Sequence, residues 1–138
     1  MTFGKPRKNL GSKGQENVYE LLRFCPKLDT TVIGGASRLL KHFIKTMQPK
    51  EIISYSDRRW SDGNLYRKLG FELDHISQPN YFYVVNGKRK NRFALRKDVL
   101  VRDYGCDPTM SEREFTKTKG WYRIYDCGTM DWKLKISH

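Results

Sequence analysis

The sequence TVIGGASRLLKHF, residues 31–43, places two adjacent glycines directly before a run with helical spacing. Apolar residues recur from there at helical intervals, at Ala36, Leu39, Leu40, Phe43, Ile44 and Met47. This periodicity predicts a helix over 32–47 with one buried stripe, ended by Pro49. Glycine lowers helix stability by about 1 kcal/mol relative to alanine. The pair therefore has to be explained by what the start of the helix does.

The first turn of a helix has backbone N–H groups without intrahelical partners and carries about half a positive charge. Gly34 and Gly35 leave these amides unobstructed and permit backbone angles that other residues resist. An anion such as a pyrophosphate can then approach the helix closely. A tight strand-to-helix turn without any ligand is the alternative interpretation.

The surrounding segments predict an α/β fold, of the α+β kind with a mixed sheet. Strands are expected over 18–25, 51–56, 71–76 and 80–85, the last ending in the turn dipeptide Asn86-Gly87. A short helix is expected over 62–69, with Ser61 or Asp62 as its N-cap and Gly70 just beyond its end. The order strand, helix, strand favours a right-handed crossover between parallel neighbours.

Further along the chain, residues 99–109 read as irregular. Ser111 and Glu114 have the spacing of a capping box ahead of a helix that ends near Gly120. Two alternating runs around Gly128 predict a terminal β-hairpin. Its apolar face would carry Trp132, Leu134 and Ile136, and its polar face Lys133 and Lys135. The alternative is that Trp121 and Trp132 are exposed and contact a partner protein.

The length of 138 residues fits one domain with one hydrophobic core. We expect a single domain over 1–138, with its core at 15–85, a basic segment at 86–100, and the helix and hairpin at 109–136. Residues 1–13 predict a strand end followed by a polar loop.

The charge balance predicts polyanionic partners. The chain has 27 Lys and Arg against 15 Asp and Glu, a formal charge of +12. Such a potential attracts nucleic acid, anionic membranes and phosphorylated cofactors. No apolar run approaches the roughly 18 residues of a membrane span, and no secretory signal is visible. We therefore expect a cytoplasmic protein without a membrane partner.

Cysteine and histidine are few and scattered. Cys25, Cys106 and Cys127 have no C-x-x-C spacing, so free thiols are predicted. The three histidines do not lie at metal-ligand spacing, and we expect no metal.

Six of the ten residues from 88 to 97 are basic. The predicted nucleic-acid-binding set is Arg58, Arg59, Lys88, Arg89, Lys90, Arg92, Arg96 and Lys97. These side chains are suited to neutralise backbone phosphates, with Trp60, Tyr81 or Tyr83 stacking on unpaired bases. A merely solvated charged surface is the alternative.

The ordered series of strands, glycine turn and helices resembles the GNAT N-acetyltransferase superfamily. The glycine loop, Thr31 to Ala36, is similar to that family's loop for the acetyl-CoA pyrophosphate, and Tyr66-Arg67-Lys68-Leu69-Gly70-Phe71 to its Y-x-x-x-G-F motif. The resemblance covers residues 15–85 and implies a central mixed sheet with flanking helices. It implies that acetyl-CoA is held by Ile33, Gly34, Gly35, Ala36, Ser37 and Arg38.

The same resemblance implies two catalytic residues. Tyr66 would donate a proton to the departing CoA thiolate, and Glu20 would take a proton from an amine. The alternatives are that Tyr66 packs beside Leu65 and Leu69, and that Glu20 is exposed and titrates ordinarily.

A narrower resemblance is to the GNAT-like C-terminal domain of phage homing-endonuclease-type proteins. The runs that carry it are GGASRLLKHF, ISYSDRRWSDGNLYRKLGFE, PNYFYV and RIYDCG. It implies a phage-derived, DNA-associated module in the host cytoplasm, although no nuclease motif is visible. Three functions are therefore expected as candidates: nucleic-acid binding, acetyl-CoA-dependent N-acyl transfer, and binding of a host or phage protein.

Overall fold

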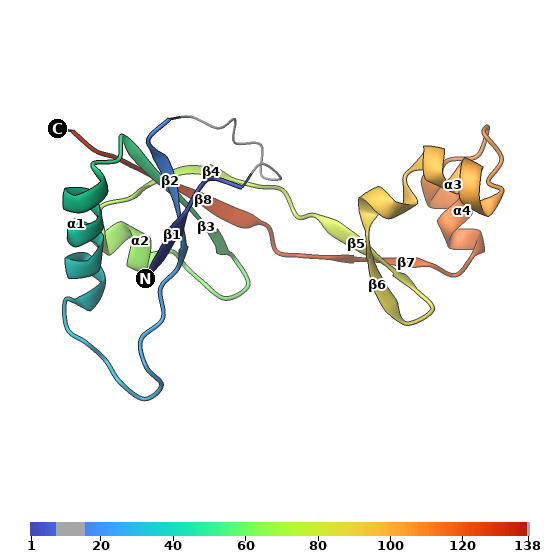
Figure 1. Ribbon diagram of the computed structural model, residues 1–138. Coiled ribbons are helices and arrows are strands. Elements are labelled where there is room, and N and C mark those ends of the chain that lie inside the picture. The colour runs from blue at the N-terminus through green and yellow to red at the C-terminus, as the bar shows by residue number, and fades with distance from the viewer. Residues whose placement is uncertain (8–15, 138) are drawn as a thin grey trace. The chain divides into compact units, whose positions relative to one another are not determined.

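The computed structural model describes residues 1–7 and 16–137 (Figure 1). Its larger sheet, sheet A, is mixed and has the strand order β1-β2-β3-β8-β4. These strands are β1 (Thr2–Gly4), β2 (Val18–Arg23), β3 (Glu51–Asp57), β8 (Thr129–Lys135) and β4 (Glu72–Ile76). The predicted fold class, an α/β fold with a mixed sheet, is confirmed.

The glycine turn leads into α1 (Gly35–Met47), which connects two parallel neighbours. β2 and β3 pair in parallel, with Val18 opposite Glu51 and Glu20 opposite Ile53. A parallel pair requires such a crossover, as the order of elements indicated. The helix begins later than predicted because Gly34 has φ +69°, a left-handed conformation outside the helical region.

The short helix α2 (Asn64–Lys68) has glycines on both sides. Its N-cap is Gly63, with φ +82°, and neither Ser61 nor Asp62. Those two side chains instead accept hydrogen bonds from the amides of Gly63 and Asn64, two residues further on. Gly70 has φ +86°, the left-handed conformation predicted after the helix.

Both helices pack on the same face of sheet A (Figure 1). The buried core consists of Leu21, Leu40, Ile52, Phe71, Met130 and Trp132. The Trp132 indole N–H donates a 2.8 Å hydrogen bond to the Ser56 hydroxyl, and its ring stacks on Tyr66 with centroids 5.3 Å apart. The Trp132 side chain is thereby fixed on both its polar and its apolar side.

The predicted terminal hairpin is wrong. β8 lies between β3 and β4 and pairs antiparallel with both. The preceding strand β7 (Tyr122–Tyr125) pairs with β5 (Tyr81–Val85) in another sheet. Alternation does reveal which residues share a face, since Trp132 and Leu134 contact the core as predicted. It does not reveal which strand is the partner, because the alternating pattern is the same for any pairing.

The second sheet, sheet B, is antiparallel with the order β6-β5-β7. β5 and β6 (Lys88–Asn91) form a hairpin across Asn86 and Gly87, which have φ +50° and +73° as an Asn-Gly turn requires. The short 3₁₀ helix η2 (Arg92–Leu95), α3 (Lys97–Tyr104) and α4 (Glu112–Thr118) complete this part of the chain.

Two expectations for these helices had different outcomes. The capping box of Ser111 and Glu114 is present at the start of α4, as predicted. The prediction of an irregular stretch over 99–109 is wrong for 99–104, which belong to α3, and right for 105–109, which form no helix or strand. The β-branched Val99 and Val101 weaken the helical signal there, and burial of Leu100 overrides it.

The chain divides into two compact units, where the sequence predicted a single domain with one core. Unit 1 comprises the described residues up to Ser77 and from Gly128 onward, and unit 2 comprises Gln78–Cys127. Unit 2 has its own core of Tyr83, Val85, Leu95, Leu100, Cys106 and Phe115. All three cysteines are free thiols, as predicted.

The ends of unit 2 are defined by hydrogen bonds on both sides of each junction. In unit 1, the Ser77 amide donates to the Thr129 carbonyl (2.9 Å), and the Thr129 amide donates to the Ser77 hydroxyl (2.9 Å). In unit 2, the Asn80 amide donates to the Asp126 carboxylate (2.8 Å), and the Asp126 amide donates to the Asn80 carbonyl (2.8 Å). Unit 2 is therefore an insertion into the connection between β4 and β8.

We expect Gly63→Ala to destabilise unit 1 far more than Gly70→Ala does. Both positions have positive φ, which costs alanine about 1 kcal/mol. A Cβ at Gly63 would also overlap the buried Trp132 ring, whereas one at Gly70 would lie 3.9 Å from Leu134. Urea denaturation should give a loss of about 3 kcal/mol or more for Gly63→Ala. Equal losses for the two variants would contradict this packing.

Candidate functional site

The glycine turn ahead of α1 is tight and largely exposed. The Gly35 amide donates to the Val32 carbonyl at 3.0 Å, while the Gly34 carbonyl accepts from the Arg38 amide and the Ser37 hydroxyl, both at 3.0 Å. The N-cap residue, Gly34, has no side chain that could cap the helix. A Cβ on Gly34 would lie 3.9 Å from Arg38 Nε. An exposed cation thus lies beside the start of the helix, with the turn itself closed by backbone hydrogen bonds.

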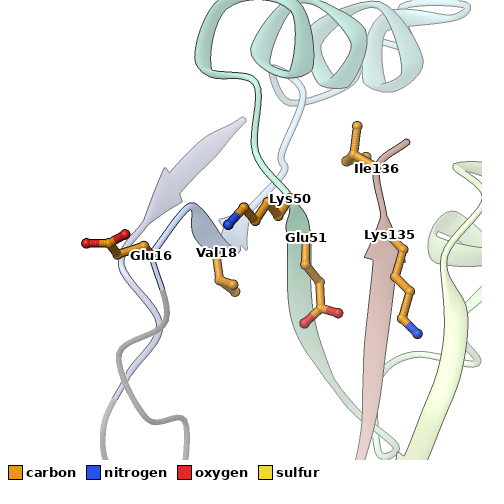
Figure 2. A pocket seen from close by; sticks show the side chains of 6 residues that line it. All are labelled: Glu16, Val18, Lys50, Glu51, Lys135 and Ile136. Atoms are coloured by element: carbon orange, nitrogen blue, oxygen red, sulfur yellow. The ribbon is translucent and has the colours of Figure 1, made fainter. Parts of the chain in front are cut away.

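The predicted cofactor residues from Ile33 to Arg38 share this turn, and Ile33 is 90% exposed. A hollow of about 630 Å³ lies at the other end of α1. Figure 2 shows its lining: Glu16, Val18, Lys50, Glu51, Lys135 and Ile136. None of the predicted cofactor residues lines it, and its two lysines are offset by two glutamates, so the lining offers a pyrophosphate no net positive charge.

Tyr66 is a core residue with a hydrogen-bonded hydroxyl. Its ring packs against Trp132 and, edge on, against Phe71 at 5.6 Å. Its hydroxyl lies 3.0 Å from the Ser54 hydroxyl, which also donates to the Leu21 carbonyl at 2.8 Å. Since serine has one hydroxyl proton, Tyr66 is the donor in the first contact. These are the contacts of a packing tyrosine, and its role as a catalytic acid stays a prediction.

Glu20 is buried, contrary to the alternative that it is exposed. Its side chain is 1% exposed, and Arg7 occupies both carboxylate oxygens. Oε2 accepts from the Arg7 amide at 3.0 Å, and Oε1 accepts from Arg7 Nε at 2.8 Å, with the second guanidinium nitrogen at 2.6 Å. The role of Glu20 as a catalytic base stays a prediction, and it would require this ion pair to open.

The predicted basic set is divided between the two units. Arg58 and Arg59 follow β3 in unit 1, where the Arg59 guanidinium lies 4.7 Å from the exposed Trp60 ring. The other six residues belong to unit 2: Lys88, Arg89 and Lys90 on β6, Arg92 on η2, and Arg96 and Lys97 at the start of α3. Unit 2 therefore contains a continuous basic segment.

Tyr83, one of the aromatics expected to stack on bases, is completely buried. Its hydroxyl donates to the Glu112 carboxylate and accepts from Arg123, with the closer guanidinium nitrogen at 2.8 Å. Burial, followed by the bond to Glu112, raises the pKa of Tyr83 to about 12. The residue is thus a neutral phenol in the core at neutral pH, and the prediction that it stacks on bases is wrong.

The exposed aromatic residues of unit 2 are ones that the sequence reasoning missed. Tyr122 and Tyr125 are 61% and 62% exposed, and Phe93 is exposed beside the Arg92 guanidinium, 4.9 Å from its ring. Phe82 lies half-buried under the Arg89 guanidinium, which is 4.6 Å from its ring. The run Tyr81–Val85 is apolar at every position, so its pattern does not show which residues face outward.

Two further observations concern metals and membranes. Across residues 1–7 and 16–137, no group of three or more His, Cys, Asp or Glu side chains is arranged to hold a metal ion. In the same described ranges, no helix has the length and apolar character needed to cross a bilayer.

We expect Arg7→Met to cost about 3 kcal/mol of stability, because it leaves the buried Glu20 carboxylate without its cation. The double variant Arg7→Met/Glu20→Gln should recover part of this loss, since a neutral amide tolerates burial better. Urea denaturation of both and of Glu20→Gln alone gives the coupling energy, and Arg23→Met on the exposed end of β2 is the control. A loss no larger than that of the control would contradict the assigned pairing.

Comparison with known proteins does not assign the chain to a family. No known family model matches the chain, and no curated protein has a significant match to it.

Proposed function

We propose that the chain binds nucleic acid through the basic segment of unit 2, residues 88–97. In this proposal the chain is a phage-type, DNA-associated module, and unit 1 supplies a GNAT-like scaffold. The parallel pair β2 and β3 joined by α1 supports that likeness. One observation carries the binding proposal: the segment presents six cations and no acidic side chain on the edge strand β6 and the elements that follow it.

Most of these cations are available to solvent. Lys88, Arg89, Arg96 and Lys97 are exposed, and Lys90 and Arg92 are half-buried. The ion pair that involves the segment within the described residues joins Arg96 to Asp98 at 3.2 Å, and both side chains are more than half exposed. Exposed pairs of this kind are weak, so a phosphate can replace the carboxylate. An edge strand with several lysines and arginines can follow a phosphate backbone.

We expect the full chain to bind DNA with an affinity that falls steeply as salt rises, because each neutralised phosphate releases counterions. Lys88→Ala/Lys97→Ala should weaken binding and reduce the slope of log K against log salt by about 2. Fluorescence anisotropy titrations at several salt concentrations measure both quantities.

The matched control is Lys117→Ala/Lys119→Ala, which removes two exposed lysines at the end of α4 in the same unit. Both double variants lower the net charge equally, so a general charge effect would weaken binding to the same extent in each. Equal slopes in the two variants, or no binding by the parent chain at low salt, would overturn the proposal.

The second candidate function is acetyl-CoA-dependent N-acyl transfer. The observation in its favour is the uncapped start of α1, where Arg38 lies beside the bare Gly34 backbone. A pyrophosphate there would meet helix amides and a guanidinium together. This candidate ranks second because Tyr66 and Glu20 are both engaged with other protein groups.

If acetyl-CoA binds at this turn, millimolar CoA should raise the melting temperature of the chain, by an amount set by its affinity. Arg38→Ala should reduce the rise, while Lys41→Ala, an exposed cation on the same helix, should not. A melting temperature that CoA leaves unchanged would remove the basis of this candidate.

A further inference from the structure

The outer face of sheet B groups apolar and aromatic side chains from β5 and β7 with an arginine from β6. Directly paired residues of antiparallel strands share a face. The registers pair Phe82 with both Ile124 and the polar Asn91, and Val84 with both Arg89 and Tyr122. We call these five residues the outer platform: Phe82, Val84, Arg89, Tyr122 and Ile124.

Within unit 2 the helices pack on the opposite face. Tyr83 and Val85, which alternate with the platform residues along β5, belong to the same buried core as Leu100 of α3 and Phe115 of α4. The platform itself retains exposed apolar surface, with Tyr122 61% and Ile124 39% exposed. A contiguous exposed apolar surface on a highly charged protein indicates a binding site.

The charges around the platform indicate what binds there. The Arg89 guanidinium lies over the Phe82 ring at 4.6 Å, whereas Lys88 and Lys90, its neighbours on the edge strand, pair with Val85 and Tyr83 and so belong to the opposite face. A ligand that combines negative charge with flat π-faces complements both features at once, and nucleotides have both.

The flat arrangement favours unpaired nucleotides over a duplex. In a duplex the base faces are stacked inside, and only base edges reach the grooves. The exposed rings would then contact no base. In a single strand every base has a free face, and stacking on an aromatic ring contributes about 1–3 kcal/mol per base.

The spacing of the platform rings suits two bases. Phe82 and Tyr122 are diagonal neighbours on adjacent strands, because Phe82 pairs with Ile124, two residues from Tyr122. Diagonal neighbours lie about 7–8 Å apart. Sheets with helices on one face and aromatic residues on the other stack two or three bases in this way.

We infer that the outer platform binds two adjacent unpaired nucleotides of a single-stranded nucleic acid, a conclusion that rests on the proposed nucleic-acid binding. One base stacks on Tyr122 and the other on the Arg89 guanidinium that covers the Phe82 ring, and the phosphates lie along the edge strand β6.

The test uses the full chain and two fluorescent probes, an oligothymidylate of about 15 nucleotides and a duplex of the same length. Tyr122→Leu should lower affinity for the single strand about tenfold, the loss of one stacked base, and leave duplex affinity unchanged. Phe82→Leu/Tyr122→Leu should lower single-strand affinity further. Leucine preserves apolar volume, so the core should remain intact, and circular dichroism checks this.

Tyr125→Leu is the matched control. Tyr125 is on the same strand with nearly the same exposure, but it pairs with Tyr81 and points to the other face. The inference is overturned if Tyr122→Leu has no larger effect than Tyr125→Leu, or if it weakens the duplex equally. In both cases the salt-dependent binding of the parent chain would persist. If the parent chain binds neither probe at low salt, the proposed function itself is overturned.

Discussion

The burial of Trp132 in the middle of sheet A is the constraint on which unit 1 depends. The residue comes from β8, the last strand of the chain, yet β8 lies between β3 and β4. Its indole N–H is satisfied by Ser56, its ring is sandwiched in the core beside Tyr66, and Gly63 has no side chain where that ring lies. Local features of strand β3 and helix α2 therefore make sense only with the C-terminal strand in place.

The sequence predicted those elements that are determined by interactions between residues close together in the chain. The apolar spacing from Ala36 to Met47, the Asn-Gly turn and the Ser111–Glu114 capping box each act within a few residues. The partner of β8 could not be predicted in this way, because any strand with a free edge accepts the same alternating pattern. The burial of Glu20 was missed for a similar reason, since it depends on Arg7, 13 residues away.

For the candidate site, the sequence identified the basic segment but not the surface beside it. The basic segment could be identified from composition alone, because six of its ten residues are Lys or Arg. The choice between Tyr83 and Phe82 as an accessible ring depends on which face of sheet B the helices cover. The helix α3 covers the face that carries Tyr83. The sequence did not predict α3, because Val99 and Val101 have low helix propensity. The two catalytic candidates were placed by resemblance, and their neighbours, Ser54 and Arg7, could not be inferred from it.

The hydrogen bonds between Ser77 and Thr129 close the ladder of β4 and β8, so unit 2 occupies the position of a very long hairpin loop. Residues 76 and 130 already face each other as the last ladder pair of β4 and β8. A two-residue turn grafted at this point would close the same ladder without the inserted residues. Unit 2 can therefore be replaced by another inserted segment, and its surface residues can change, without altering the strand pairing of sheet A.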